Sequence, residues 1–504
     1  MLSLIVWTPI LGVFLIYFLA NSEINIKRIA LTCTGIPLLL SIILAFRFNP
    51  QGKYQFVERF KWIKNLGIDY YLGIDGLSLG LVILVGILTF IVIFSINTWE
   101  HRKKAFFCCL LIMESGLLGV FTSLDLILFY VFWEIVLIPG YFLIYIWGGK
   151  ERQKASIKFL IYTLLGSLVM LIAILAVYFK ANLNTFSIPD LATVNFPVNF
   201  QKVIFIFLLV GLAIKIPLFP FHSWLPDAYV EAPNLVTVLF SGLLAKMGAY
   251  GFIRLAYSLV PEGLRSFSWL VSLLAVFTVI YATLCASAQK DLKKMFAYSS
   301  LGHMGLIMLG IGAFNRIGLN GSIFYMLNHG LIAGGIFLLI TIIYEATGTL
   351  EINKINKLAT YLPLGIIPFW FFLLASFGLP GTGGFIAELY VLIGAFQSNV
   401  AFGILAGIST IIVAGYIFPT LSKLSFKGDT YNQEGEKTRR QEDKKMSIGG
   451  QIKKNGLATE SLAQNRTFLS LYILGIIILI LGFYPGIFIK ISNNYINFLA
   501  TFTR

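Results

Sequence analysis

Charged residues are scarce in this chain. Asp, Glu, Lys and Arg make up 12% of its 504 residues, about half of the ~25% that soluble proteins carry. Hydrophobic residues make up 58%, and the mean hydropathy is +0.85. This composition excludes a chain built mainly of soluble domains. It predicts an all-α polytopic membrane protein, because helices satisfy their own backbone groups inside lipid.

Cysteine is scarce too, and the usual cofactor motifs are missing. The four cysteines lie in or beside apolar runs without the spacing of a metal site: Cys33, Cys108, Cys109 and Cys285. We interpret them as small core residues. The sequence also lacks a glycine-rich dinucleotide turn, a phosphate-binding loop, an iron–sulfur cysteine set and a haem ligand pair. We therefore expect no cofactor and no metal in this chain.

A cleavable signal peptide and a nucleic-acid-binding surface are not indicated either. Residues 1–20 are apolar without a basic start or a small-residue cleavage site, so we expect a retained first span. The net charge is +15, but the basic residues cluster in short loops, chiefly 101–104, 150–154 and 289–294. By the positive-inside rule these loops face the cytoplasm, which places both termini on the outer side.

Long apolar runs are what the sequence has in abundance. A span needs about 20 apolar residues, and by that measure we count about 14 spans. The run at 361–397 is too long for one helix and contains Pro380-Gly381 and Gly383-Gly384, so we expect two half-helices around a break. The spans centre near residues 3–20, 29–46, 78–98, 106–121, 125–147, 157–179, 203–222, 234–258, 267–287, 295–314, 321–345, 361–397, 401–422 and 467–489.

Two groups of five spans have matching interruptions. Spans four to eight contain a break at Lys215–Pro220, and spans nine to thirteen contain another at Pro380–Glu388, each in the fourth span of its group. Five is odd, so the second group would be inverted relative to the first, as in many transporters. The expected units are 1–104 (three N-terminal spans), 105–258 and 259–425 (the two repeats), 426–466 (a polar cytoplasmic loop) and 467–504 (the last span).

Charges inside the apolar runs mark the candidate functional residues. Lys215 and Lys246 lie near the middle of two runs, and Pro217 and Pro220 interrupt the first run. An ammonium at mid-bilayer depth costs about 3 kcal/mol or more. A charge beside a broken helix in lipid is typical of an ion pathway.

Glu134 lies in the middle of the fifth span, and we expect it to pair with Lys215. Pairing offsets part of the desolvation of both groups and couples their protonation. A protonated acid satisfied by a neighbour is the alternative. Lys246 has no acidic residue nearby in sequence, and burial disfavours its charged form, which suits a group that accepts and donates protons. A lysine that extends to the interface is the alternative for this residue.

Two histidines and a second glutamate follow in the later spans. His303 has Ser299 one helical turn away, and His329 has Tyr325 one turn away. Imidazole exchanges protons near neutral pH, so we expect a proton relay; satisfied core histidines are the alternative. Glu388 follows the second break and is the candidate exit residue.

Two further buried candidates are weaker. For Glu114, function and packing are equally expected. His222 lies beside Asp227 and Glu231 at the end of span seven, and we interpret this group as a structured loop rather than a conduit.

Six segments together resemble a known family. They are GIDGLSL (73–79), FYVFWEIVLIPGYFLIYIWGG (129–149), GLAIKIPLFPFHSWLPDAYVEAP (211–233), LLAKMGAYG (243–251), KDLKKMFAYSSLGHMG (290–305) and LPGTGGFIAELYVLIGAF (379–396). They are similar to the antiporter-like membrane subunits of respiratory complex I, most closely chain 4, called chain M in bacteria. The chain is also similar to the cyanobacterial and plastid D chains. The family fold has 14 transmembrane helices, two inverted five-helix repeats and broken helices seven and twelve.

The resemblance implies proton-translocation roles for six residues: Glu134, Lys215, Lys246, His303, His329 and Glu388. A glutamate at position 388 is typical of chain M, whereas chains L and N and the multisubunit sodium/proton antiporters usually have lysine there. The 426–466 loop departs from the short connection usual in the family.

The implied function is proton translocation in the membrane arm of a complex I-type NAD(P)H or ferredoxin:quinone oxidoreductase. This subunit would hold no redox centre, while partner subunits would hold flavin, iron–sulfur clusters and quinone. Its neighbours would be L-type and N-type chains and lipids, with no nucleic acid, in a bacterial inner, thylakoid or mitochondrial inner membrane. The alternatives are a subunit of a multisubunit Na⁺/H⁺ antiporter and a structural spacer.

Overall fold

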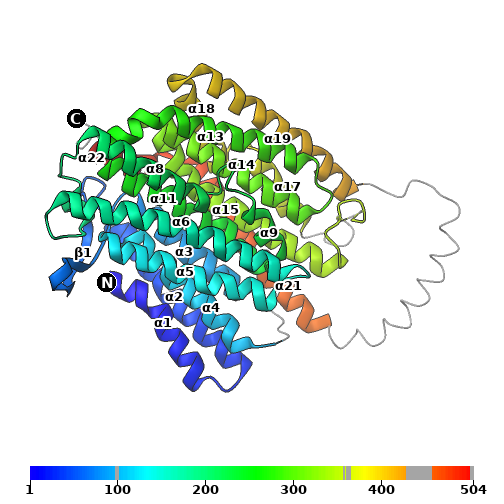
Figure 1. Cartoon of the computed structure of the whole chain (residues 1–504). Helices are drawn as coiled ribbons and strands as arrows, with labels where there is room; N and C mark the ends of the chain where they lie inside the picture. Colours follow the sequence, from blue (N-terminus) through cyan, green and yellow to red (C-terminus); the bar gives the residue numbers. More distant parts are fainter. Residues whose placement is uncertain (97–100, 356–357, 359–364, 427–456, 500–504) are drawn as a thin grey trace, which may run out of the picture.

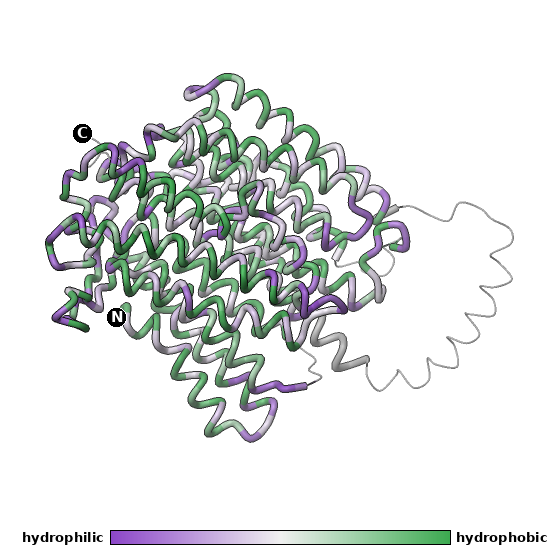
Figure 2. Tube along the Cα trace, in the orientation of Figure 1, coloured by the Kyte–Doolittle hydropathy of each residue, from purple (hydrophilic) through white to green (hydrophobic). Residues whose placement is uncertain are grey.

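The protein is a bundle of membrane-spanning helices. The computed structural model describes residues 1–96, 101–355, 358, 365–426 and 457–499, and their helices run roughly alongside one another (Figure 1). Within these residues, 13 helices are long and apolar enough to cross a membrane. Figure 2 shows hydrophobic residues along the helices and hydrophilic residues concentrated towards their ends. The predicted all-α polytopic class is confirmed.

The long helices correspond one for one to the predicted spans, except for the span at 361–397. They are α1 (Leu2–Leu19), α2 (Glu23–Arg47), α3 (Ser78–Ser95), α4 (Lys103–Thr122), α5 (Leu126–Trp147), α6 (Arg152–Ala181), α8 (Val198–Lys215), the composite helix Asn234–Leu259, α13 (Pro261–Ser287), α14 (Leu292–Gly312), α15 (Arg316–Thr347), α19 (Val400–Phe426) and α21 (Leu457–Phe483).

Both expected breaks are present. Helix α8 ends at Lys215, and a turn separates it from α9 (Trp224–Glu231). The run at 361–397 contains α17 (Ile366–Ser376) and α18 (Gly383–Ser398), separated by a turn. In that turn Gly381 has φ +92°, a conformation that residues with side chains rarely adopt. The first break leaves Lys215 at a helix C-terminus, where the helix dipole stabilises a positive charge.

The eighth span is irregular. It consists of α10 (Asn234–Leu239), the π-helical turn η2 (Phe240–Leu244), α11 (Ala245–Gly251), a second π-helical turn η3 (Phe252–Ala256) and α12 (Tyr257–Leu259). Such turns occur frequently at functional sites. Here one turn directly precedes Lys246 and the other contains Arg254.

The prediction of an all-helical chain misses a β-hairpin. Strands β1 (Gln55–Ile63) and β2 (Ile68–Ile74) pair antiparallel, with Arg59 opposite Tyr71. The indole nitrogen of Trp7 in α1 donates to the Tyr70 hydroxyl at 3.0 Å. The hairpin therefore lies at the end of the bundle where α1 begins (Figure 1).

The C-terminal region differs from its predicted boundaries. Residues 427–456 of the predicted polar loop lie outside the described residues. Residues 457–466 are already helical, because α21 begins at Leu457. The last span ends at Phe483, not near 489, and a separate helix, α22 (Gly486–Leu499), follows. Pro485 explains the interruption, since proline lacks the N–H needed to continue a helix.

The core is centred on α15 and the eighth span. The most apolar stretches of both are completely buried, whereas only 28% of the corresponding stretch of α19 is buried. Helices α1 and α2 lie at one edge of the bundle, and α18 and α19 lie at the opposite edge (Figure 1). Residues on α15 and the eighth span therefore face protein on all sides, which is where two of the candidate residues lie.

Candidate functional site

Lys246 lies at the centre of the bundle, and no acidic side chain pairs with it among the residues that the structure describes. It is completely buried, and its Nζ lies 2.6 Å from Nδ1 of His329 on α15. The same ammonium donates to the backbone carbonyl of Ser241, inside the π-helical turn η2. The structure thus joins two of the predicted residues from spans eight and eleven by one hydrogen bond.

His303 on α14 extends this contact toward the second half of the bundle. Its ring centroid lies 5.0 Å from that of His329. Its Nε2 lies 3.5 Å from the Ser299 hydroxyl, at the limit of a hydrogen bond. Its Nδ1 lies 2.8 Å from the hydroxyl of Tyr325. Tyr325 was expected beside His329, one turn away on its own helix, but its hydroxyl hydrogen-bonds to His303.

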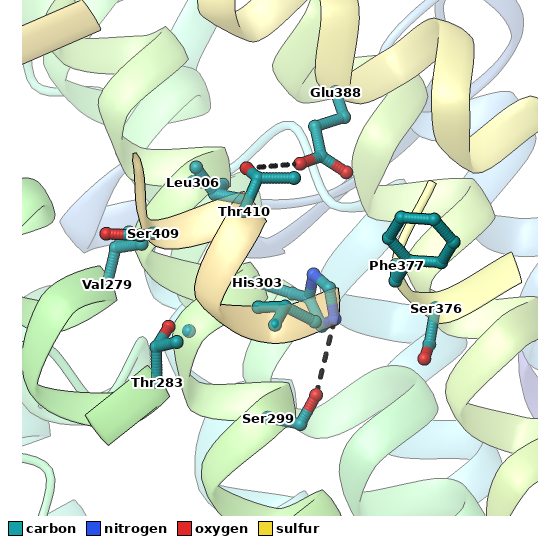
Figure 3. A pocket seen from close by; sticks show the side chains of 12 residues that line it. Val279, Thr283, Ser299, His303, Leu306, Ser376, Phe377, Glu388, Ser409 and Thr410 are labelled. Atoms are coloured by element: carbon teal, nitrogen blue, oxygen red, sulfur yellow. Dashed lines mark hydrogen bonds between the residues drawn. The ribbon is translucent and has the colours of Figure 1, made fainter. Parts of the chain in front are cut away.

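Glu388 on α18 ends this row of side chains. The residue is 6% exposed, and its carboxylate accepts a hydrogen bond of 2.7 Å from the Thr410 hydroxyl on α19 (Figure 3). The Tyr325 hydroxyl also interacts with the Glu388 carboxyl. Tyr325 therefore hydrogen-bonds to His303 and lies near Glu388.

Two small cavities surround His303. Each has a volume of about 10 Å³, close to the minimum for one water molecule. The first lies between His303 and Glu388 (Figure 3). Its hydroxyl-bearing lining residues are Thr283, Ser299, Ser376, Ser409 and Thr410. Hydroxyls can hold such a water by donating or accepting, so the cavity can take part in proton transfer.

Lys215 is enclosed by aromatic rings. It is 2% exposed, and its Nζ lies 5.6 Å from the ring centroid of Trp133 and 5.9 Å from that of Phe159. Both contacts are within the range of cation–π attraction. The faces of aromatic rings thus stabilise this buried charge.

The expected ion pair between Glu134 and Lys215 is not formed. The carboxylate of Glu134 acts on Lys215 electrostatically, but its Oε1 atom is buried without a hydrogen-bond partner, and no ion pair joins the two residues in the described part of the chain. The physical reason is helical geometry. Trp133 faces Lys215, and side chains of consecutive helical residues point in different directions. Glu134 instead lies by Tyr130 on its own helix.

A glycine brings the two lysine-bearing elements together. A Cβ atom at Gly248 would lie 2.9 Å from the backbone nitrogen of Ile216 and 3.2 Å from the carbonyl carbon of Lys215. The C-terminal end of α8 therefore packs directly on α11, at a glycine two residues from Lys246. This close packing places the first lysine next to the element that carries the second.

The weaker candidates lie apart from this row. Glu114 on α4 is completely buried near Thr89, and neither carboxylate oxygen has a hydrogen-bond partner by geometry among the described residues. The His222 group is a set of separate contacts. The His222 ring packs on Tyr281 at 4.6 Å between centroids, and Asp227 pairs with Lys158 at 2.8 Å. Glu231 accepts from a backbone N–H of the loop between α5 and α6, at residue 151.

Sequence reasoning missed a buried ion pair. Arg254 in η3 donates to both carboxylate oxygens of Asp75, at 2.6 and 2.9 Å, and both side chains are almost completely buried. The Arg254 Nε donates to the Tyr250 hydroxyl at 3.0 Å. The available signal was a second cation in span eight together with the aspartate of the GIDGLSL segment. The pair ties the chain before α3 to span eight.

The described residues offer no group of three or more His, Cys, Asp or Glu side chains that could hold a metal. What they offer is a row of titratable side chains that can exchange protons, running from Lys246 through His329, His303 and Tyr325 to Glu388.

Comparison with known proteins gives consistent results. Residues 123–413 match the family described as "NADH:quinone oxidoreductase/Mrp antiporter, TM", a range that contains all six predicted site residues. The chain is 38% identical over 443 residues to NADH-quinone oxidoreductase subunit M of Rickettsia bellii, covering 86% of this chain and 89% of that protein. It is 39% identical over 419 residues to NADH-ubiquinone oxidoreductase chain 4 of Marchantia polymorpha, covering 82% and 84%.

Solved structures share the architecture. A chain of respiratory complex I from Thermus thermophilus aligns with a TM-score of 0.84 at 28% identity, covering 100% of this chain and 99% of that one. A chain of the Mrp complex from Dietzia sp. also gives a TM-score of 0.84, at 22% identity and with coverages of 99% and 97%. At that identity the second likeness shows the fold alone.

Proposed function

This chain belongs to the NADH:quinone oxidoreductase/Mrp antiporter family of membrane proteins, and on that premise we propose that it is the chain M-type subunit of a complex I-type quinone oxidoreductase. In this proposal it moves protons across the membrane, and quinone reduction in other subunits drives the movement. The observation that carries the proposal is the buried row from Lys246 to Glu388, which brings together residues from four separate spans. Hydrogen bonds and a ring contact join its members as far as Tyr325, and Glu388 lies near the Tyr325 hydroxyl.

Burial explains why these residues would move protons rather than only pack. A buried cation without a counter-ion is costly, so Lys246 can release its proton more readily than a solvated lysine. The His329 Nδ1 at 2.6 Å is placed to receive that proton. Imidazole accepts and releases protons near neutral pH, and each ring has two nitrogens, so His329 and His303 can carry the proton onward to Tyr325 and Glu388.

Lys215 and Glu134 act as the switch in this proposal. When the two groups pair, the carboxylate holds Lys215 in its charged form. When they separate, the proton of Lys215 is free to move to Lys246. In this proposal the separated state is the one without a direct ion pair between the two residues. Quinone reduction elsewhere in the complex would shift this equilibrium, since a nearby charge favours one protonation state over the other.

The setting of the subunit follows from the same proposal. Flavin, iron–sulfur clusters and quinone belong to partner subunits, and this chain contributes no redox centre. Its neighbours are L-type and N-type antiporter-like chains and lipids, in a bacterial inner, thylakoid or mitochondrial inner membrane. We also propose that units 105–258 and 259–425 are inverted repeats, supported by one broken helix in each.

A sodium/proton antiporter subunit is the second candidate. The matched family includes Mrp antiporters. Relatives named as NADH–quinone oxidoreductase subunits at 38–39% identity favour the first candidate. Proton uptake that needs Na⁺, measured in vesicles without an electron donor, would support the antiporter instead.

The central test is Lys246→Met in the assembled complex, because methionine keeps the length of the chain without the charge. Proton pumping in membrane vesicles during quinone reduction should fall by about tenfold or more, the scale of a lost proton-transfer group. Lys27→Met is the matched control, since Lys27 is a half-buried lysine that only donates to the carbonyls at the end of α3. Equal pumping by the two assembled variants would contradict the proposal.

A further inference from the structure

Tyr325 occupies the position between the last histidine and the terminal carboxylate. It is 2% exposed, its hydroxyl lies 2.8 Å from Nδ1 of His303, and the same hydroxyl interacts with the Glu388 carboxyl. The three residues come from α14, α15 and α18. One hydroxyl oxygen therefore hydrogen-bonds to the last histidine and lies near the terminal carboxylate, and both of these groups can exchange protons.

A tyrosine hydroxyl has one proton to donate and lone pairs that accept. In one arrangement it accepts from His303 Nδ1–H and donates to the Glu388 carboxylate. In the other it donates to an unprotonated His303 Nδ1 and accepts from a protonated Glu388. The direction in which this single hydrogen points thus depends on whether His303 or Glu388 holds the proton. A change in that direction accompanies transfer of the proton from one to the other.

We propose that Tyr325 is the proton-transfer residue between His303 and Glu388, an inference that rests on the proposed function of the row. In the step, the His303 Nδ1–H bond breaks as a new Tyr325 O–H bond forms. The original Tyr325 O–H bond breaks as the Glu388 carboxylate gains a proton. One proton leaves the imidazolium, one arrives at the carboxylate, and the tyrosine is neutral before and after. Rotation of its hydroxyl after Glu388 releases the proton restores the starting arrangement.

The cavity between His303 and Glu388 offers a second route. Its volume of about 10 Å³ admits at most about one water, which would have to leave its hydrogen bonds to the hydroxyls of the lining. The tyrosine oxygen is already held in place by α15, so the direct bridge needs no ordering of a water molecule. The direct route therefore needs only side chains that the protein itself supplies.

The titratable groups facing Tyr325 come from four elements. They are His303 on α14, His329 on its own helix, Glu388 on α18 and Tyr416 on α19. Each of the first three belongs to the proposed row, so the hydroxyl is surrounded by groups that gain and lose protons rather than by fixed charges.

Tyr325→Phe removes the bridge and keeps the ring. Proton pumping by the assembled complex in vesicles should fall by about tenfold, the scale of one lost proton-transfer group. Tyr257→Phe is the matched control, because its buried hydroxyl donates only to a backbone carbonyl, that of Ile311, at 2.7 Å. Loss of pumping in Tyr325→Phe but not in Tyr257→Phe is the expected result.

The outcomes separate the two proposals. If Lys246→Met slows pumping but Tyr325→Phe matches Tyr257→Phe, the tyrosine inference is overturned and the row stands without it. If Lys246→Met pumps normally, the row itself is overturned.

A second measurement covers the case in which Tyr325→Phe does not assemble. Replacing Tyr325 by a fluorotyrosine keeps the hydroxyl and nearly the same volume, but makes the phenol more acidic. A transfer residue should then move the pH profile of pumping toward lower pH. An unchanged profile would mean that the hydroxyl only packs, and would overturn the inference.

Discussion

Arg254 shows what a single buried charge requires. Its guanidinium is fully buried and is bound by both oxygens of Asp75. The ring centroids of Tyr250 and Tyr495 lie 5.1 and 5.5 Å away. The Asp75 carboxylate also accepts hydrogen bonds from two backbone N–H groups, that of residue 77 just before α3 and that of residue 78 at its start. Both side chains are almost completely buried from solvent, so each charge depends on the other.

Removing one member of this pair should be costly. Arg254→Leu leaves the Asp75 carboxylate buried and unpaired, and we expect a loss of about 3–5 kcal/mol of stability. The loss would be measured as a lower thermal unfolding temperature of the purified complex or as loss of the subunit from it.

The control is the exposed pair of Arg265 and Glu262, whose side chains are 65% and 40% exposed and 3.8 Å apart. Arg265→Leu should change stability by about 0–1 kcal/mol. If Arg254→Leu lost no more stability than Arg265→Leu, the buried pair of Arg254 and Asp75 would not be needed for the stability of the subunit.

At the level of residues, the sequence predicted which side chains are buried better than it predicted their partners. Lys246 and His329, both predicted to be buried, are joined by a hydrogen bond. The direction of Glu134 depends on the rotation of α5, which a sequence does not reveal. Asp75 and Arg254 are 179 residues apart, so no local pattern could pair them.

Among the elements, α15 and α18 pack more closely than side chains would allow. A Cβ atom at Gly394 would lie 2.4 Å from the Cα of Gly318 and 2.5 Å from its backbone nitrogen. A backbone cannot move aside as the end of a side chain can. These glycines therefore let α18, which carries Glu388, approach α15, which carries Tyr325.

Gly394→Ala should separate the two helices. We expect a loss of about 1–3 kcal/mol, typical of overpacking, together with slower proton pumping. Gly407→Ala is the control, because a Cβ there would meet nothing within 4 Å. Since alanine is the better helix former by about 1 kcal/mol, Gly407→Ala should be neutral or stabilising. The measurement is the thermal unfolding temperature of both variants. A Gly394→Ala variant as stable as Gly407→Ala would contradict the prediction.

Element boundaries were predicted where composition changes sharply. The apolar runs and the prolines marked the long helices and both breaks, because length and backbone chemistry decide them. The hairpin of β1 and β2 was missed because its strands mix charged and aromatic residues without regular alternation. The end of the last span was misplaced by a few residues because apolar residues continue past Pro485, whereas the helix ends at Phe483.

Across the whole molecule, the two ends of the bundle differ. The hairpin lies at the end where α1 begins, and a bridge between Leu72 and Ser123 places the start of α5 there too. The loop after α5, with Lys150, lies at the opposite end, where the Trp147 indole donates to the His101 carbonyl. Basic loops at that end favour its placement in the cytoplasm.

Labelling tests this orientation. In intact cells, a membrane-impermeant thiol reagent should label Lys61→Cys in the hairpin and fail to label Lys150→Cys until the membrane is opened. Both lysines are exposed, so access to the reagent depends on the side of the membrane. The unsubstituted chain gives the background from its own cysteines, and the reverse pattern would place the termini inside.

The complete burial of α15 should affect which of its positions vary among related sequences. The most apolar stretch of this 32-residue helix is completely buried by other parts of the protein. In α6, only 39% of the corresponding most apolar stretch is buried. In an alignment of relatives, variable positions in α6 should recur about every 3.6 residues, on the side facing lipid. Variable positions in α15 should show no such rhythm, since any replacement along it must suit a neighbouring helix. Natural variation alone should therefore distinguish the axis of the bundle from its rim.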